Sequence, residues 1–163
     1  MIILLIIIVS IIGYAGSGAS YSNPPQTTYA PQSAVSPMSV DAAVLAKMSE
    51  MNARMTPPLE AFSDAAGSQD TVKIRINAVL LRAYIDQNLP EMRQLAAGAT
   101  TKKSAAQEYV AFLEDVRTAS DLWIQAIDKI NSGDIDGGTD LVFEGNTYLE
   151  KAQAHILKVN ALR

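Results

Sequence analysis

The strongest constraint on the fold of this chain is a helical period of mostly apolar residues between positions 109 and 130. They recur by alternating steps of four and three without a miss: Tyr109, Leu113, Val116, Ser120, Trp123, Ile127 and Ile130. This spacing keeps one face of an α-helix apolar, whereas a half-buried strand would alternate at every second residue. Such a helix must bury its apolar face against something else, so the period predicts a fold built by packing helices.

Two further segments follow the same pattern, and they predict helices over about 40-66 and 135-163. The apolar positions of the first are Val44, Met48, Met51, Met55 and Phe62. The seam of the second is Leu141, Gly145, Tyr148, Ala152, His155, Val159 and Leu162. Ser39 is a suitable N-cap for the first helix, and Asp41 lies in its first turn, where the helix dipole favours an anion. Gly145 weakens the last helix by about 1 kcal/mol relative to Ala, so we expect it to permit close packing of a neighbouring helix, with close approach of a ligand as the alternative.

A helix predicted over about 69-97 carries two apolar stripes. The first stripe is Val72, Ile76, Val79, Leu80 and Ala83, and the second is Ile74, Leu81, Ile85, Leu89 and Met92. We expect the two stripes to form one broad buried face. Pro90 lacks an amide donor and predicts a kink in this helix, while Pro57 and Pro58 predict a bend or break near Met55. Whether these three prolines open a pocket is a question that the sequence leaves open.

The predicted helices, at about 40-66, 69-97, 101-131 and 135-163, are joined by short connections. Short connections make consecutive helices antiparallel, and heptad-like seams favour shallow left-handed crossing angles. We therefore predict an all-α fold, an up-down-up-down antiparallel four-helix bundle over residues 40-163. A helical-repeat fold is the alternative, because residues 132–152 are similar to the turn and ending of helix-hairpin repeats. No second copy of that segment occurs at a fixed period.

The first forty residues differ in character from the rest. No Asp, Glu, Lys or Arg precedes Asp41, and residues 2–12 form an apolar run that only Ser10 interrupts. As a helix this run spans ~16 Å, which is short for a hydrocarbon core of ~30 Å and matches the apolar region of a secretory signal. We expect residues 1-19 to be a signal peptide, cleaved after Ser17 or Ala19, with a retained membrane anchor as the alternative. Both make the bundle extracytoplasmic, either secreted or anchored to the membrane by its N-terminus.

Residues 20-39 are rich in Pro, Ser and Thr and have no periodic apolar face. Four of the seven prolines in the chain fall here, at positions 24, 25, 31 and 37. Proline favours extended polyproline II backbone over helix or strand. We therefore expect a disordered linker that acts as a semi-stiff spacer between the N-terminal segment and the bundle.

The composition excludes most catalytic and metal chemistry. The chain has no Cys, which excludes disulfides, thiolate zinc sites, iron–sulfur clusters and Cys nucleophiles. A net charge of -4, with Lys102–Lys103 as the one adjacent basic pair, argues against nucleic acid as a partner. The single His, His155, has no Glu three residues before it, as a di-iron bundle requires, and no Gly-x-Ser-x-Gly elbow accompanies it. We expect no enzymatic activity, with neither catalytic nor metal-binding residues.

One cofactor hypothesis comes from the layout of the bundle. The start of the first helix and the end of the last lie at the same end, so His155 comes level with Met48, with Met51 one turn deeper. Imidazole and thioether groups are axial ligands of haem. In this layout, over residues 41–163, the chain resembles the small periplasmic b-type four-helix cytochromes, which take Met from the first helix and His from the last. A further loose similarity is the Thr56-Pro57-Pro58-Leu59 segment, although it lies within a predicted helix rather than between helices.

Two functions therefore stay open. The first is an exported, non-enzymatic helical-bundle structural or binding module for an unknown protein or small ligand, with the membrane contacted only by the N-terminal segment. It binds no cofactor, and its methionines are adaptable core filler. The alternative, implied by the resemblance, is a b-type haem-binding bundle for electron transfer, in which His155 and Met48 or Met51 hold haem b. The sequence does not determine the oligomeric state or whether the N-terminal segment is cleaved.

Overall fold

The computed structural model describes residues 39–162, which form helices joined by short connections. The helices are α2 (Val40–Ser68), α3 (Thr71–Gly98), α4 (Lys103–Asn131) and α5 (Ile135–Leu162). Every helix begins and ends within two residues of its predicted range. The predicted signal or anchor lies outside the described residues, as does the predicted linker apart from Ser39.

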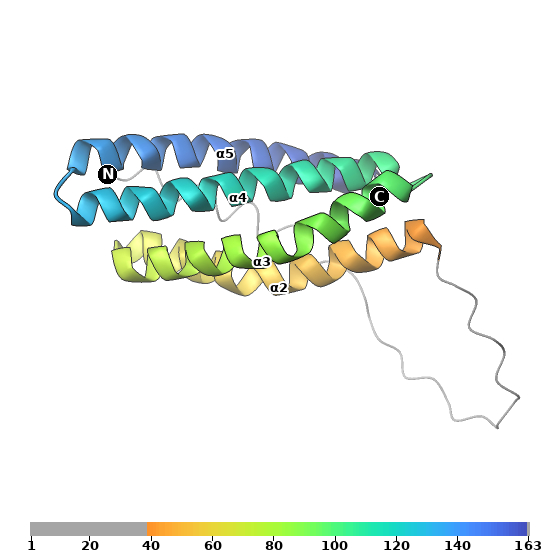
Figure 1. The fold of residues 1–163 in the computed structure, drawn as a ribbon, viewed down its shortest axis with the longest axis horizontal. Coiled ribbons are helices and arrows are strands. Elements are labelled where there is room, and N and C mark those ends of the chain that lie inside the picture. The colour runs from red at the N-terminus through yellow and green to blue at the C-terminus, as the bar shows by residue number, and fades with distance from the viewer. Residues whose placement is uncertain (1–38, 163) are drawn as a thin grey trace, which may run out of the picture.

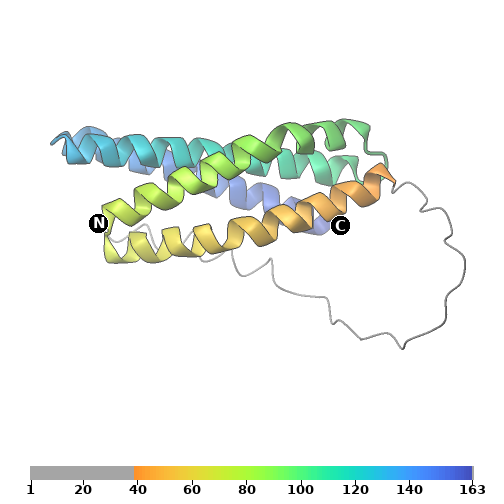
Figure 2. The same cartoon turned by 60° about the horizontal axis from the view of Figure 1, so that its bottom comes forward.

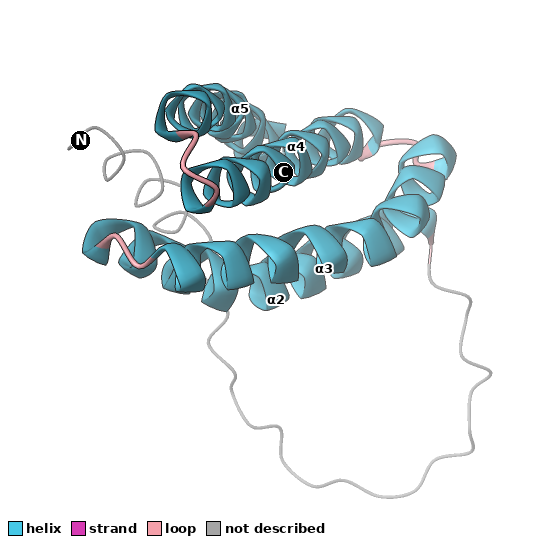
Figure 3. Ribbon diagram, turned by 60° about the vertical axis from the view of Figure 1, so that its left-hand side comes forward, coloured by secondary structure: helices cyan, strands magenta, loops and turns pink. Residues whose placement is uncertain are grey.

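The prediction of an all-α bundle is confirmed. Figure 1 shows α4 and α5 as one antiparallel pair and α2 and α3 as a second pair beside it. Figure 3 shows the same two pairs, and in Figure 2 α3 runs obliquely across α4. α4 packs closely against both α5 and α3, whereas α2 packs mainly against α3. Within residues 39–162, no helix combines the length and apolar character that crossing a bilayer requires.

Local capping groups explain where the helices start. The amide of Ala42 donates to the Ser39 hydroxyl (3.2 Å), and the amide of Lys73 donates to the Asp70 carboxylate (3.0 Å). These side chains satisfy amides that the first turn of a helix leaves without an intrahelical acceptor. α4 has no capping side chain of its own at Lys102. Asp41 of α2 takes that role instead, as described below.

The predicted seams of α2 and α4 form the core. All five apolar positions of the α2 seam are buried, and all but Ile130 of the α4 seam are buried too. Phe62 of α2 and Trp123 of α4 meet edge to face, with ring centroids 5.1 Å apart. Since α4 packs against both of its chain neighbours and also touches α2, it is the central helix of the bundle.

Small residues bring α5 against α4. Gly138, Gly145 and Ala152 are buried at intervals of seven residues along α5. A Cβ atom at Gly145 would lie 2.9 Å from two atoms of the Trp123 indole, and one at Gly138 would lie 2.8 Å from a backbone oxygen of α4. Gly145 therefore permits the close helix packing that the sequence predicts. The prediction fails at Leu162, which is 45% exposed because it lies beyond Val159, the last buried residue of the seam.

The prediction of one broad buried face on α3 is wrong. The second stripe, from Ile74 to Met92, is buried, whereas Val72, Ile76, Val79 and Leu80 are exposed and Ala83 is exposed with them. At 100° per residue the centres of the two stripes lie on nearly opposite sides of the helix, so a single layer of neighbours can cover only one. The more regular stripe faces α2 and α4, and the other faces solvent.

The prolines do not break their helices. α2 is continuous through Pro57 and Pro58, and α3 is continuous through Pro90, although Figure 1 shows the second half of α3 turning toward α4. Each proline leaves the carbonyl four residues earlier without its amide donor. Those carbonyls belong to Ala53, Arg54 and Asp86, which are exposed residues on the solvent side of their helices, where water can bind the freed oxygen.

Candidate functional site

The structure places His155 at the surface seam between α5 and α4. Its Nδ1 lies 2.6 Å from a carboxylate oxygen of Glu108, and its Nε2 lies 3.6 Å from a carboxylate oxygen of Asp115. Lys158 approaches the same Glu108 carboxylate at 3.5 Å. The hydrogen bond from His155 lowers the pKa of Glu108, whereas burial raises the pKa of Asp115. The ring therefore links two carboxylates of α4, and all three side chains remain partly exposed.

The two methionines of the haem hypothesis lie elsewhere. Met48 and Met51 are fully buried in a cluster that includes Val44 and Tyr109, and the Tyr109 hydroxyl donates to the side chain of Asn52 on α2. Ligation of a haem iron by His155 would need a ring nitrogen that now faces Glu108 or Asp115. The structure thus brings Met48 and Met51 into one cluster and places His155 in a separate polar contact.

The described core contains a small cavity beside Trp123. A cavity of about 10 Å³, lined by residues such as Phe62, Leu81 and Trp123, lies between α2, α3, α4 and α5. That volume suits at most one water molecule. The indole N–H of Trp123 and the hydroxyl of Tyr84 are the buried side-chain groups that lack a hydrogen-bond partner in the described part of the chain. Within residues 39–162, no group of three or more His, Asp or Glu side chains is placed to hold a metal ion.

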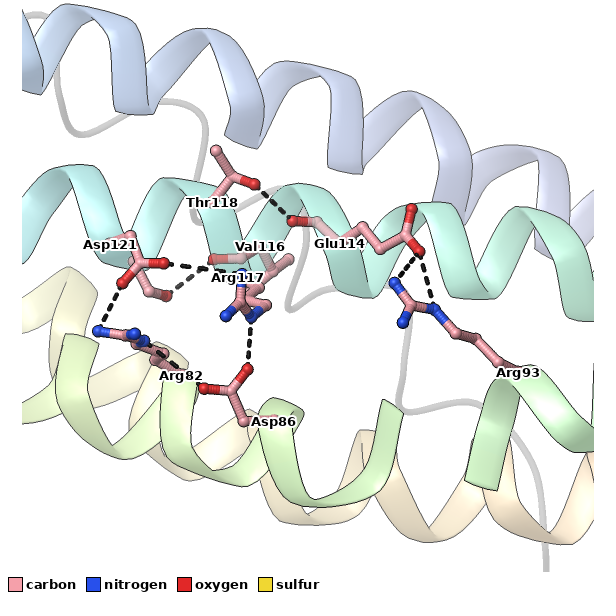
Figure 4. Close-up of polar contacts among 9 residues, drawn as sticks. Arg82, Asp86, Arg93, Glu114, Val116, Arg117, Thr118 and Asp121 are labelled. Carbon is pink, nitrogen blue, oxygen red and sulfur yellow. Dashed lines mark hydrogen bonds and ion pairs between the residues drawn. The ribbon is translucent and has the colours of Figure 1, made fainter. Parts of the chain in front are cut away.

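A row of ion pairs crosses from α3 to α4 (Figure 4). Arg93 donates to Glu114 through two nitrogens, at 2.7 and 3.1 Å, and Arg82 binds Asp121 at 2.7 Å. Asp86 accepts a hydrogen bond from Arg117, which raises the pKa of that guanidinium. These side chains are between about a quarter and half exposed, so each pair contributes little energy by itself. Together they fix the register between the two helices.

Pro90 lines an open hollow beside these ion pairs. The hollow has a volume of about 360 Å³, and its walls include Leu89, Arg93, Glu114 and Thr118. One of the three prolines therefore borders a pocket. Its charged groups already pair with one another across the hollow, and the hydroxyl of Thr118 donates to the backbone carbonyl of Glu114. We interpret the hollow as the space that the turn in α3 leaves next to α4, and its ion pairs as structural contacts.

The most unusual surface feature is the exposed stripe of α3, defined here by Val72, Ile76, Val79 and Leu80. Their exposed fractions are 64%, 53%, 39% and 54%. They lie at helical spacing on the first three turns of α3, so they form one continuous aliphatic ridge. Soluble proteins scatter single apolar residues over their surface, whereas a contiguous patch marks a contact surface.

The charged residues that flank the stripe are neutralised within the chain. Lys73 pairs with Asp70 at 3.2 Å, and Arg75 binds Asp128 of α4 at 2.8 Å. The contact between Arg75 and Asp128 raises the pKa of Arg75 and lowers that of Asp128. The ridge is therefore apolar along its crest and electrically neutral along its sides, which suits burial against another surface.

The four residues of the stripe can be recognised in the sequence, but because they are apolar the sequence predicts that they are buried in the core. The angular positions of the residues around the helix could have indicated their exposure. Two apolar stripes on opposite sides of one helix can both be buried only if a separate neighbour packs on each side. No protein-family model, curated protein or solved structure matches this chain. The function is therefore inferred from the geometry alone.

Proposed function

We propose that this protein is a non-enzymatic binding module, exported by its N-terminal segment, that recognises a protein partner through the exposed stripe of α3. The observation that carries this proposal is the contiguous aliphatic ridge from Val72 to Leu80, which no described element covers. A small ligand fits the ridge poorly, because ligand sites are concave and enclose most of the ligand surface. A second protein surface can cover the ridge over its whole length.

The rest of the molecule supports a scaffold role for the bundle. The core is closely packed around α4, and the surface ion pairs between α3 and α4 hold the helix that presents the ridge. A binding face on a rigid helix loses little conformational entropy when it is covered. The proposal therefore assigns α3 to recognition and the other helices to support.

Cysteine accessibility tests the proposal, since the natural chain has no Cys. Ile76→Cys places a thiol on the ridge, and Gln94→Cys places one on the polar half of the same outward face, as a matched control. Full-length variants in cells that export the chain are treated with a maleimide that does not cross the cytoplasmic membrane. We expect Gln94→Cys to react at least tenfold faster than Ile76→Cys, and both to react equally after denaturation.

Two outcomes contradict parts of the proposal. Equal reaction of the two thiols in cells means that the ridge is uncovered, and the binding function is then wrong. Failure of both thiols to react until the cells are lysed means that the bundle is not outside the cytoplasm, and the predicted localisation is then wrong.

A further inference from the structure

We infer that the partner of the α3 stripe is a second copy of this chain, so that the working form is a homodimer joined helix to helix through α3. This inference rests on the proposed binding function and names its partner. The shape of the ridge favours this pairing. The ridge consists of aliphatic side chains of similar size on the convex surface of one helix, and two such ridges can interdigitate as packed helices do.

The residues of the ridge also favour self-association over capture of an unlike partner. Dominant anchor residues in protein interfaces are enriched in Trp, Tyr and Arg, which insert into a pocket of the partner, whereas homodimer interfaces are distinguished by a more apolar composition. The stripe offers only Val, Ile and Leu at its crest. A two-fold dimer needs no pocket, because each copy presents the same surface to the other.

The charge pattern of α3 also suits a second copy of the chain. The chain has a net charge of -4, so two copies repel one another over most approaches. Between Thr71 and Ile85, α3 carries Lys73, Arg75 and Arg82 and no acidic residue. Each of these cations pairs with a carboxylate of the same chain. The stripe is thus a neutral face at which two acidic copies can meet without bringing unpaired carboxylates together.

The apolar area of the stripe is compatible with the centre of a dimer interface. Four aliphatic side chains exposed to this extent offer on the order of 350 Å² of apolar surface per copy, within the range of the largest apolar patch on a typical monomer, which is often functional. A standard interface buries ~800 Å² per partner, of which a little more than half is apolar. The stripe therefore supplies most of the apolar centre of a dimer, and the flanking polar residues would form its rim.

Disulfide trapping tests the inference in the full-length chain. We expect Val79→Cys, on the ridge, to form a covalent dimer when intact exporting cells are treated with a mild oxidant, as seen on a non-reducing gel. Gln94→Cys on the same helix should remain monomeric. A disulfide requires Cα atoms within about 7 Å, so trapping reports the close approach of two copies of the ridge.

A second pair of variants distinguishes parallel from antiparallel packing of the two α3 helices. If Val72→Cys traps a dimer by itself, the two α3 helices run parallel. If only the double variant Val72→Cys/Ala83→Cys traps one, they run antiparallel, because residues 72 and 83 are ~16 Å apart along one helix and cannot link within a chain. Both results support the dimer.

A charge on the ridge should weaken the dimer. Leu80→Lys introduced into Val79→Cys should therefore reduce trapping at least fivefold while far-UV circular dichroism stays unchanged.

The outcomes separate this inference from the proposed function. If none of Val79→Cys, Val72→Cys and Val72→Cys/Ala83→Cys yields a dimer while Ile76→Cys stays protected from maleimide in cells, the ridge binds a different protein, and the homodimer is wrong while the binding function stands. If none of them yields a dimer and Ile76→Cys also reacts freely, both are wrong. Trapping of Gln94→Cys as fast as Val79→Cys would show random collision and would also overturn the inference.

Discussion

Asp41 joins the start of α2 to the connection between α3 and α4. Its carboxylate accepts hydrogen bonds from the amides of Thr100 (2.9 Å), Thr101 (3.0 Å) and Lys102 (3.3 Å), and from the hydroxyls of both threonines. The sequence indicates an anion in the first turn of its own helix, but the structure shows that it also caps another helix. The hydrogen bonds, above all that from the Thr101 hydroxyl, hold the pKa of Asp41 well below its usual range.

We predict that Asp41→Asn lowers the melting temperature by several degrees at neutral pH. A carboxyl whose pKa is lowered by folding stabilises the native state above its unfolded pKa of 3.8, and this contribution declines as the pH falls further. The difference in melting temperature between the natural chain and the variant should therefore be constant from pH 7 to about pH 5 and shrink below about pH 4. Asp140→Asn, at an exposed site on α5, is the control. A difference that does not depend on pH would contradict the assigned role.

We predict a second single-residue effect at Gly145. In Gly145→Ala the new Cβ would overlap the Trp123 ring at 2.9 Å, and neither α4 nor α5 can move away without opening the core. Overpacking costs about 1–3 kcal/mol, and the gain in helix propensity recovers about 1 kcal/mol. Denaturant unfolding should show a net loss of stability of about 1 kcal/mol. Gly98→Ala, where the nearest atom is 3.5 Å away, should be neutral or slightly stabilising. A stabilised Gly145→Ala would show that the packing there is loose.

At the scale of the helix, the sequence correctly predicts which residues are buried where a helix has only one apolar stripe. The α2 seam around Met48 and the α4 seam around Trp123 each define one face, and each face is buried. α3 has two faces of similar apolar character, and period alone does not say which one the neighbours cover. The sequence therefore shows the stripe of α3 without showing that it faces solvent.

The contacts between helices could not be predicted, because they depend on the register of packed elements. Glu108 and Asp115 lie on α4, and nothing in the sequence indicates that His155 of α5 comes between them. The ion pair of Arg93 with Glu114 likewise depends on how far α3 is shifted along α4. A single hydrophobic period indicates which face of a helix is buried, but these polar contacts need the axial shift as well.

At the scale of the whole molecule, the bundle is organised around α4. This helix buries residues along its whole length and packs against α5, α3 and α2, whereas α5 packs closely only against α4. The amides of a helix exchange with solvent only when its packing opens, and openings that free α5 need not free α4. The central helix should therefore be the last part of the bundle to open.

Hydrogen exchange of the full-length chain, read by mass spectrometry, measures this order directly. We predict that peptides covering Tyr109 to Ile127 exchange most slowly, and that peptides from the last two turns of α5, where Leu157 and Leu162 are exposed, exchange at least tenfold faster. If the homodimer forms, peptides from the first half of α3 should become less protected in Leu80→Lys, while those of α4 keep their rates. Equal exchange in α4 and the end of α5 would mean that the bundle opens only as a single unit, and α4 would then have no central role.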